Sequence, residues 1–320
     1  MVDVVCIGQA LVDCITKNVR TKKAGSIAKT AQSITLSVGG DALNQSLILS
    51  RLGHSVRTGA IIGQDIAGRV VRDALNNGGA DVSQLDVYDD IQTVVADIVV
   101  SMDGSHYSIS SDAVSLGGHH ISAKIAEQTR ILSFASLFRA PLDDFASAYQ
   151  LAQTAKKQGA IICADTKMPL LREIDLKEWQ PFFELVDFIF PNEHEAKWAY
   201  DQLHGHSDEQ PDYPQLAEVF RQLGVQNVII KAGDKGCYYD DGKNCGMFPA
   251  LPVEAIDTTG AGDNFVSGFI SALLEDKNIE ECLRFASSCA AVCIGSIGTT
   301  TGLSSRKKAE DLYDRYYKLK

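Results

Sequence analysis

The sequence reads Asp257-Thr258-Thr259-Gly260-Ala261-Gly262-Asp263-Asn264-Phe265 and then continues as an apolar stretch to Leu274. Small residues between polar ones, followed at once by an apolar run of helical length, predict a tight turn that opens into a helix. The first N–H groups of a helix lack partners within it and carry partial positive charge, so this turn is a candidate anion pocket. Asp263 places a carboxylate beside that pocket. A phosphoryl-transfer site needs both features, because N–H groups neutralise the developing charge and a base accepts the proton of the attacking hydroxyl.

The same stretch also has a purely structural interpretation. Asp is a favoured N-cap residue, so Asp263 could cap the helix that follows. Gly260-Ala261-Gly262 could likewise form an ordinary turn. The organisation of the remaining chain therefore has to decide between a cap and a catalytic base.

Composition limits the class of protein. A chain of 320 residues, 45% hydrophobic and 22% charged, suits one large or two unequal globular domains with a substantial core. The net charge of -11 argues against nucleic acid or an anionic membrane as the main partner. No stretch is long and apolar enough to span a bilayer, and the apolar segment from Met1 to Ile15 reads as a strand, not a signal peptide. Several cysteines lie in apolar runs and none forms a C-x-x-C pair, which is typical of small buried side chains in a reducing cytoplasm.

Strand-like and helix-like stretches alternate along most of the chain, which predicts a parallel sheet covered by helices on both faces. The expected strands are 2–8, 56–62, 131–135, 161–164, 186–190 and 227–231. The expected helices are 41–52, 66–77, one from Pro141 to about Gly159, four that follow Asn192, Pro214, Gly262 and Asn278, and 307–317.

Two stretches break this alternation. Residues 11–38 show β-like alternation without a good helix, and residues 92–111 read as a hairpin with strands 93–101 and 107–111. The turn of that hairpin is expected at Asp103-Gly104. Both stretches could form one small sheet inserted into the α/β body. Ligand sites in open α/β sheets lie at the C-terminal ends of the strands, so a small sheet over that edge would be a lid that excludes water.

Polar residues near that edge are candidates for substrate binding. Asp13 interrupts an apolar run after the first strand, which fits either a solvated face of a lid strand or a substrate contact. Gly39 and Gly40 let the backbone approach a ligand closely, at the point where the suspected lid returns to the body. Asp41 and Asn44 suit vicinal hydroxyls, and Asp41 is at the same time the expected N-cap of its helix.

Two later loops have the composition of a nucleotide site. Asn192 and Glu195 have the spacing of an N-cap and its N3 partner, and on structural grounds alone a capping box is the favoured interpretation. The functional interpretation is a pair that holds a water-coordinated Mg²⁺ beside the phosphates. The loop 231–236 is either a plain hairpin turn or a loop close to phosphates, and no classical P-loop is present.

A basic cluster lies within the suspected lid. Its members are Lys17, Arg20, Lys22, Lys23 and Lys29. A solvated loop explains the cluster, and a preference for an acidic or phosphorylated sugar is the alternative.

These elements, in this order, resemble the ribokinase-like sugar kinases, also called the PfkB family. The match runs nearly end to end, and its most specific part is Asp257-Thr258-x-Gly260-Ala261-Gly262-Asp263. The other matching elements are Gly39-Gly40-x-x-x-Asn44, the stretch 52–68, Asn192-x-x-Glu195 and Gly233-x-x-Gly236. The form of residues 39–44 resembles a less studied sugar-kinase subgroup and not ribokinase itself.

The resemblance implies a fold and a domain organisation. We expect one ribokinase-like domain over residues 1–320, built as a three-layer α/β/α sandwich with a mostly parallel central sheet. A small β lid, formed from about 11–38 and 92–111, often makes the dimer contact in this family. Dimerisation through the lid predicts an exposed hydrophobic face on residues 93–100.

The resemblance also implies an activity, with ATP and Mg²⁺ as cofactors. Members transfer the γ-phosphate of ATP to a hydroxyl, usually a primary one, of a sugar or nucleoside. By similarity Asp263 is the base, and the backbone N–H groups of Gly260, Ala261, Gly262 and Asp263 form the anion hole. The sugar-binding residues would be Asp13, Gly39, Gly40, Asp41 and Asn44.

The remaining implied roles concern the nucleotide and metal ions. Asn192 and Glu195 would organise Mg²⁺ through water, and Asn192 would also lie by the phosphates. The residues implied to line the nucleotide are Lys231, Gly233, Lys235, Gly236 and Ser287. Many members also bind K⁺ through carbonyls near Asp257 and Thr259 and the loop 294–299.

The chain departs from the family pattern in two places. Ser287 stands where many members carry Asn or His near adenine, and the turn 103–107 lacks the acidic-Arg pair of many lids. We expect a kinase that acts on a monosaccharide or sugar acid, with no nucleic-acid or membrane partner and with a homodimer formed through the lid. A nucleoside kinase, with Tyr107 or Phe138 stacking on the base, and a non-catalytic sugar or nucleotide sensor are the alternatives.

Overall fold

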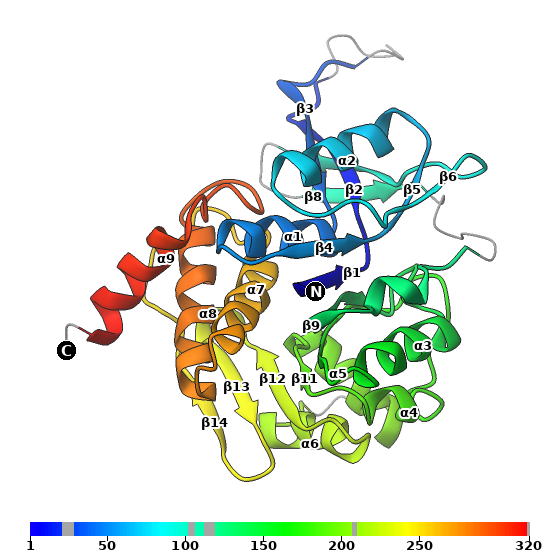
Figure 1. Ribbon diagram of the computed structural model, residues 1–320. Coiled ribbons are helices and arrows are strands. Elements are labelled where there is room, and N and C mark those ends of the chain that lie inside the picture. The colour runs from blue at the N-terminus through cyan, green and yellow to red at the C-terminus, as the bar shows by residue number, and fades with distance from the viewer. Residues whose placement is uncertain (21–28, 102–105, 112–118, 207–209, 319–320) are drawn as a thin grey trace.

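The computed structural model of the chain describes residues 1–20, 29–101, 106–111, 119–206 and 210–318. An eight-stranded sheet in the order β14-β13-β12-β11-β10-β9-β1-β4 forms its centre (Figure 1). The parallel strands are β1 (Val2–Ile7), β4 (Val56–Gly59), β9 (Thr129–Leu137), β10 (Ile161–Thr166), β11 (Phe188–Ile189) and β12 (Asn227–Lys231). β13 (Cys237–Asp240) and β14 (Cys245–Phe248) extend the sheet in antiparallel fashion.

Helices cover both faces of this sheet, as the apolar strands require. One layer contains α1 (Asp41–Arg51), α7 (Ala261–Leu274), α8 (Ile279–Ile294) and α9 (Arg306–Tyr313), with a π-helical turn at Asp314–Lys318. The other contains α3 (Phe145–Lys156), α4 (Gln180–Phe183), α5 (Glu193–His204) and α6 (Tyr213–Gln222).

Alternate residues of each strand pack into different layers. In β1, Val5 and Ile7 belong to the core under α3 to α6, whereas Val4 and Cys6 belong to the core under α1, α7, α8 and α9. Successive side chains of a strand point to opposite faces, so a sheet buried on both sides needs an unbroken apolar run. The predicted three-layer α/β/α sandwich is confirmed.

A separate small sheet lies at one end of the molecule. It has four strands in the order β3-β2-β7-β8, with bounds β2 (Leu11–Lys17), β3 (Ser33–Gly39), β7 (Val95–Val100) and β8 (His106–Ser110). α2 (Ile66–Asn77) packs beside it, and β5 (Ile61–Gly63) pairs with β6 (Asp86–Tyr88) nearby (Figure 1). The expected hairpin is thus present, while its predicted turn at Asp103-Gly104 lies outside the described residues.

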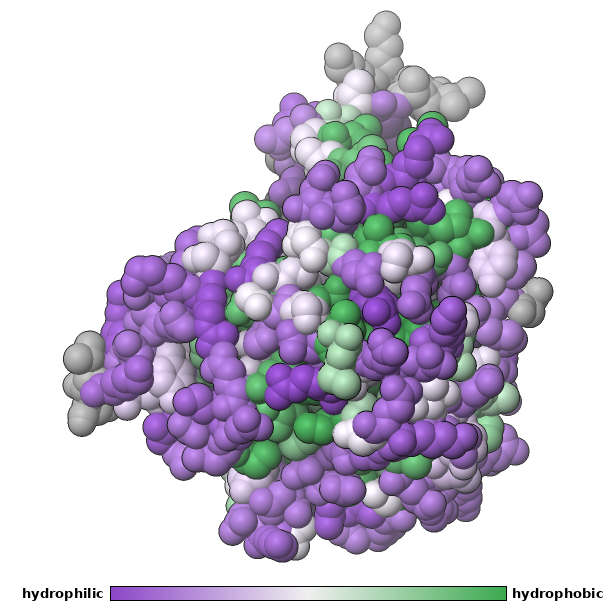
Figure 2. Space-filling view, in the orientation of Figure 1, coloured by the Kyte–Doolittle hydropathy of each residue, from purple (hydrophilic) through white to green (hydrophobic). Residues whose placement is uncertain are grey.

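The small sheet has two unlike faces. Strand pairing places Asp13 in one row with Ser37, Ala96 and Ser110, on the face that turns toward the body. Two other rows carry large apolar side chains on the outer face, Leu36 and Ile109 in one and Ile34 and Tyr107 in the other, each more than half exposed. The predicted apolar surface on residues 93–100 is therefore largely wrong, because β7 is an inner strand and the flanking β3 and β8 carry most of the exposed side chains. Hydrophilic side chains cover most of the face in Figure 2, and hydrophobic ones show at its upper end, where Figure 1 places the small sheet.

Three predicted element boundaries are wrong. The strand expected at 56–62 breaks at Ala60, and its halves β4 and β5 belong to different sheets. The helix expected from Pro141 begins only at Phe145, because the carboxylate of Asp144 accepts a hydrogen bond of 3.0 Å from the Ser147 N–H and caps it. Asp41 is the first residue of α1 and not its N-cap, which is Gly40.

Two further features of the fold concern the cysteine thiols and the length of the helices. All eight cysteines are free and six of them are buried, and burial raises the pKa of the Cys6 thiol to about 12. These side chains act as small hydrophobes, as predicted. In the described ranges, the helices are all too short or too polar to cross a membrane.

Candidate active site

The C-terminal ends of five neighbouring strands bring polar side chains to one edge of the central sheet. Gln9 follows β1, Arg139 follows β9, Lys167 follows β10, Asn192 follows β11, and Lys231 ends β12. This is the edge at which open α/β sheets bind ligands. Sequence reasoning identified Asn192 and Lys231 here but missed Arg139, Lys167 and the neighbouring Asp165. A charged residue at or directly after an apolar strand was the signal that could have found all three.

The turn before α7 requires glycine. Gly260 is the N-cap of α7 with a positive φ of 78°, and a Cβ there would lie 2.7 Å from the Cα of Thr299. The N–H of Ala261 donates to the Thr258 carbonyl at 3.2 Å. The following first-turn N–H groups, those of Gly262 and Asp263, have no acceptor within the helix. The helix start therefore presents donors to a bound anion.

Asp263 lies in the first turn of α7 and does not cap it, so the capping interpretation of this residue is wrong. Its side chain is buried, and Oδ2 accepts a hydrogen bond of 2.8 Å from Nδ2 of Asn44 on α1. Thr299 Oγ1 in turn donates to Oδ1 of Asn44 at 3.3 Å. Oδ1 of Asp263 is buried and has no partner among the described residues. A buried carboxylate with one oxygen held and one free can accept a proton from a ligand.

The surroundings of Asp263 shift its proton affinity. Burial raises its pKa well above the ordinary range, and the nearby carboxylates of Asp41 and Asp165 raise it further. Lys167 and the hydrogen bond from Asn44 act in the opposite direction. A base with a raised pKa is the stronger proton acceptor once it is ionised.

Lys167 forms an ion pair with Asp41, another carboxylate of the site. Its Nζ lies 2.9 Å from Oδ1 of Asp41. Burial acts to lower the pKa of Lys167. The carboxylates of Asp41, Asp165 and Asp263 outweigh this effect and raise the pKa well above its usual value. Lys167 is therefore a permanent positive charge between three acids.

Lys231 approaches the start of α7 from β12. Its Nζ forms an ion pair with Oδ1 of the buried Asp165. A Cβ placed on Gly262 would lie 3.5 Å from the same Nζ, so the ammonium group faces the first turn of the helix. Burial raises the pKa of Asp165 to about 6 against the influence of Lys231 and Lys167, and Oδ2 of Asp165 is buried without a partner. An ammonium group beside free helix N–H groups favours a bound anion.

Asn192 and Glu195 form the predicted capping box at the start of α5. The Asn192 side chain accepts from the Glu195 N–H at 2.9 Å, and Glu195 Oε2 accepts from the Asn192 N–H at 2.8 Å. Glu195 also accepts from Asn192 Nδ2 at 2.8 Å and from Thr166 Oγ1 at 2.9 Å. The capping-box interpretation is therefore confirmed. The capping box fixes the buried Glu195 carboxylate beside Asp165.

The loop after β12 is a hairpin connection, because β12 and β13 pair in antiparallel register from Lys231 to Cys237. Gly236 has a positive φ of 99°, and a Cβ there would meet the Phe248 carbonyl. Lys235 is exposed and pairs with Glu193 at 3.0 Å. Ser287 is buried on α8. The structure thus places Lys231 at the helix start and turns Lys235 toward α5.

The small sheet brings Asp13 to the same region. A Cβ on Gly39 would lie 2.2 Å from Asp13 Oδ2, so the glycine leaves room for that carboxylate. Burial, with a further contribution from Asp41, raises the pKa of Asp13 to about 6. Gly40 has a positive φ of 92°, and a Cβ there would meet the Gln9 backbone. Asp13 is therefore a second partly buried acid near Asp41.

The basic cluster of the small sheet can be described only in part. Lys22 and Lys23 lie outside the described residues. Lys17 and Arg20 are solvent-exposed, and so is Lys29 on the returning segment. Exposure of these three favours the interpretation as a solvated loop.

Asp257 joins the turn before α7 to the loop after α8. Its Oδ1 accepts from the Thr259 N–H at 2.9 Å, and Oδ2 accepts from the Gly298 N–H at 2.9 Å. Desolvation acts to raise the pKa of Asp257. These hydrogen bonds outweigh that effect and hold the pKa below its ordinary value. The carboxylate thus fixes the backbone carbonyls of both loops.

A cavity of about 430 Å³ lies between the small sheet and the strand edge, a size that suits a small-molecule ligand. Its lining residues are Gln9, Leu11, Val94, Ser110, Ser111, Phe138, Arg139, Ala140, Asp143, Leu170 and Leu171. The two aromatic side chains considered for base stacking do not offer a free ring here. The Phe138 ring packs in the core against Trp179 and Trp198, and Tyr107 lies on the outer face of the small sheet.

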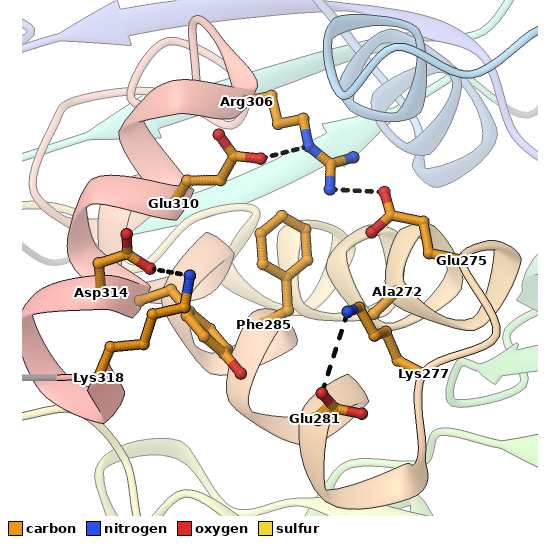
Figure 3. A pocket seen from close by; sticks show the side chains of 10 residues that line it. Ala272, Glu275, Lys277, Glu281, Phe285, Arg306, Glu310, Asp314 and Lys318 are labelled. Carbon is orange, nitrogen blue, oxygen red and sulfur yellow. Dashed lines mark hydrogen bonds and ion pairs between the residues drawn. The ribbon is translucent and has the colours of Figure 1, made fainter.

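A second cavity of about 330 Å³ lies between α7, α8 and α9, and no predicted site residue lines it (Figure 3). Its charged side chains neutralise one another. Arg306 pairs with Glu275 at 2.5 Å and Lys318 pairs with Asp314 at 2.9 Å. This cavity therefore lacks the unpaired donors and acceptors found at the strand edge.

Residues 1–306 match the family described as pfkB family carbohydrate kinase. The chain belongs to the pfkB family of carbohydrate kinases. It is 28% identical over 283 residues to the ribokinase of Haemophilus influenzae, which covers 87% of this chain and 88% of that protein. It is 26% identical over 316 residues to the ribokinase of Bacillus subtilis, with 98% and 99% covered. The chain is accordingly a sugar kinase, which confirms the predicted enzyme class.

Solved structures agree with the family assignment. The Thermotoga maritima ribokinase has a TM-score of 0.81 at 25% identity, over 98% of this chain and 99% of that chain. The Arabidopsis thaliana ribokinase complexed with ribose and ATP has a TM-score of 0.83 at 24% identity, over 98% of each chain. A Ribokinase II structure from E. coli in complex with ATP and Mg²⁺ has a TM-score of 0.77 at 22% identity, over 99% of this chain and 100% of that chain. The predicted ribokinase-like fold is confirmed.

Proposed function

We propose that this sugar kinase transfers the γ-phosphate of ATP to a hydroxyl, a primary one, of a monosaccharide or sugar acid, with Asp263 as general base. The observation that carries the proposal is the free, buried Oδ1 of Asp263 beside the first turn of α7. A base must reach the acceptor hydroxyl while the N–H groups face the transferred phosphoryl group. One turn of helix supplies both here.

The start of α7 is the proposed anion hole, formed by Gly260, Ala261, Gly262 and Asp263. Because the Ala261 N–H already donates to Thr258, the N–H groups of Gly262 and Asp263 carry most of this role. Lys231 adds a positive charge at the same point. A loose phosphoryl-transfer transition state requires positioning and charge neutralisation more than covalent help.

The acceptor sugar would lie between the small sheet and α1. Asp13 and Asp41 are the acids that would accept hydrogen bonds from its hydroxyls, and Asn44 would donate or accept. Gly39 and Gly40 leave space for these contacts, since a side chain at either would collide with Asp13 or with the Gln9 backbone. Within one domain over residues 1–320, the small sheet would act as the lid that excludes water.

The residues at the strand edge fit ATP and Mg²⁺. Lys231 and the helix N–H groups suit a triphosphate, with Gly233, Lys235, Gly236 and Ser287 further along the nucleotide. Asn192 and Glu195 would hold Mg²⁺ through water, and the unpartnered Oδ2 of Asp165 is a further oxygen ligand of the kind that Mg²⁺ prefers. When bound, Mg²⁺ neutralises charge on the phosphate oxygens.

K⁺ would bind between the two loops that Asp257 joins. The carbonyls near Asp257 and Thr259 and those of residues 294–299 are the proposed ligands. The two hydrogen bonds of the Asp257 carboxylate support this proposal, because they hold both loops in place.

We further propose that two copies associate through the outer face of the small sheet, in the cytoplasm that the free thiols suggest. Ile34 and Leu36 on β3 lie on the same face as Tyr107 and Ile109 on β8, and all four are large and exposed. Large apolar side chains exposed on both edge strands of one sheet face favour an interface between copies.

The test is ADP release with Mg²⁺-ATP across sugars, sugar acids, sugar phosphates and nucleosides, with and without K⁺. A signal that depends on one acceptor class supports the proposal and identifies that class. ATP binding without turnover on any acceptor would contradict it and favour a sensor. A response to nucleosides alone would contradict the sugar assignment. The buried ring of Phe138 already disfavours the nucleoside alternative.

A further inference from the structure

We infer that the acceptor of this kinase carries an anionic group, a carboxylate or a phosphate, and that Arg139 binds it. The inference rests on the proposed function, because it assigns the acceptor class of the same site. It goes beyond that proposal by assigning a role to a residue that neither the motifs nor the family resemblance indicated.

Arg139 is held in place at the edge of the cavity between the small sheet and the strand ends. It is the second residue after β9, and its N–H donates to the Ser136 carbonyl at 3.0 Å. The preceding Phe138 has a positive φ of 73°, which is rare for a residue other than glycine, and its ring is locked in the core. A backbone conformation of this cost persists where the surrounding structure fixes it, and such positions cluster at ligand sites.

Among the residues that the structure describes, the guanidinium group of Arg139 has no hydrogen-bond or ion-pair partner. Its side chain is half-buried, and Nε is buried with no acceptor among the described residues. No carboxylate in the described ranges lies within ion-pair distance of it. A buried donor without an acceptor costs free energy, and more so when it is charged.

The acids near Arg139 have other partners. Asp41 pairs with Lys167 at 2.9 Å, and the Glu195 oxygens accept from Asn192 and Thr166. Asp143, which also lines the cavity, faces Arg172 at 3.8 Å. Each of these acids therefore has another donor as its partner. The guanidinium group of Arg139 stays available to a ligand in the cavity.

The cavity supplies the room that an anionic acceptor needs. Arg139 lines it together with the hydroxyls of Ser110 and Ser111 on the small sheet and the apolar side chains of Leu170 and Leu171. A planar guanidinium group can bind a carboxylate or phosphate through two parallel hydrogen bonds. Asp41 lies near both Arg139 and Asp263, so an acceptor held by Arg139 could direct its hydroxyl toward Asp263.

The experiment compares matched pairs of acceptors that differ in one anionic group, D-gluconate with D-glucitol and fructose 6-phosphate with fructose, within a wider panel of sugar acids and sugar phosphates. Binding is measured by calorimetry on the Asp263→Asn variant without nucleotide, and KM is measured on the wild type with Mg²⁺-ATP. We expect the anionic member to bind more tightly in at least one series. The carboxylate and phosphate series identify which anion is used.

Arg139→Gln should raise the KM and Kd of the anionic acceptor by roughly 30-fold or more, as expected for loss of one partner of a buried charge pair. The KM for ATP should stay the same. Arg139→Lys should recover part of the affinity, because it restores the charge and not the planar fork. Arg130→Gln is the matched control, since Arg130 lies at the opposite end of β9 and contacts Asp3 and the Leu274 carbonyl.

Three results would overturn the inference. Equal or better binding of the neutral members throughout the panel would exclude an anionic acceptor, even if the protein proves to be an active kinase. Unchanged affinity in Arg139→Gln would exclude this residue as the anion ligand. A rise in the KM for ATP alone would assign Arg139 to the nucleotide. Absence of turnover with retained anion selectivity would instead contradict the proposed function and leave the binding role of Arg139 intact.

Discussion

The side-chain amide of Asn44 donates a hydrogen bond of 2.8 Å to Oδ2 of Asp263, across 219 residues of sequence. This contact joins the first turn of α1, which belongs to the proposed sugar site, to the first turn of α7, which forms the proposed anion hole. Because Oδ2 is occupied, the carboxylate is oriented and only Oδ1 is left for an acceptor hydroxyl. Thr299 Oγ1 holds the other end of the Asn44 amide and so fixes its orientation. The geometry thus positions the base before substrate binds.

Asp263→Asn should stabilise the folded protein at neutral pH. The pKa of Asp263 is higher in the folded chain than in the unfolded chain, so the folded state gains from protonation at low pH and loses that gain as the pH rises through the folded pKa. An amide removes the buried charge and keeps an oxygen for Asn44. We expect a gain of about 1 kcal/mol in the free energy of unfolding, measured with urea at pH 7.5. A variant less stable than the wild type at that pH would show that the charge is fully compensated.

Lys167→Met should move the acidic limb of the pH profile of kcat/KM to higher pH. Lys167 favours the ionised form of Asp263, and its loss also leaves Asp41 unpaired, so both changes raise the pKa of the base. The matched control is Lys156→Met, because Lys156 pairs with Asp187 at the other end of the sheet. If the acidic limb does not move, or moves equally in both variants, then Lys167 does not control the pKa of the base.

Gly260→Ala should damage both stability and turnover. Alanine at a φ of 78° is strained by about 1–3 kcal/mol, and its Cβ would in addition collide with the Thr299 backbone. Gly246→Ala is the control, because a Cβ at Gly246 meets no atom within 4 Å. Urea unfolding and ADP release report the two effects separately. Full activity of Gly260→Ala would mean that the turn does not have to hold its present shape.

Leu36→Glu combined with Ile109→Glu should produce a monomer. Both side chains lie on the outer face of the small sheet, on strands β3 and β8, and a buried charge at each would prevent two such faces from packing. Sedimentation velocity distinguishes a 34.6 kDa monomer from a particle of twice that mass. Met247→Glu on β14 is the exposed control. A wild-type protein that is already monomeric, or a variant that stays dimeric, contradicts the proposed interface.

The central sheet was predictable because its strands are buried on both faces and therefore read as unbroken apolar runs. The break at Ala60 was not, since the residues on both sides of it are apolar and β-prone while they belong to two different sheets. The predicted start of α3 was wrong for a related reason. Pro141 is a typical first residue of a helix, but the cap at Asp144 decides where the helix begins.

The chemistry of the anion pocket could be read from one stretch because the turn, the helix start and Asp263 are contiguous in sequence. Contacts between distant elements could not. Nothing in a single sequence indicates that Asn44 reaches Asp263, that Lys167 pairs with Asp41, or that Arg139 is left unpaired. These relations arise only when the sheet brings its strand ends to one edge.

The most direct test of the account is the rate of phosphoryl transfer in Asp263→Asn, measured in single turnover with saturating Mg²⁺-ATP and the acceptor that the ADP-release panel identifies. We expect the rate to fall by roughly 10²–10⁴-fold, the usual contribution of a general base, while the Kd values for ATP and acceptor change little. A transfer rate close to that of the wild type, in a variant shown to bind both ligands, would contradict the assignment of Asp263 as the base.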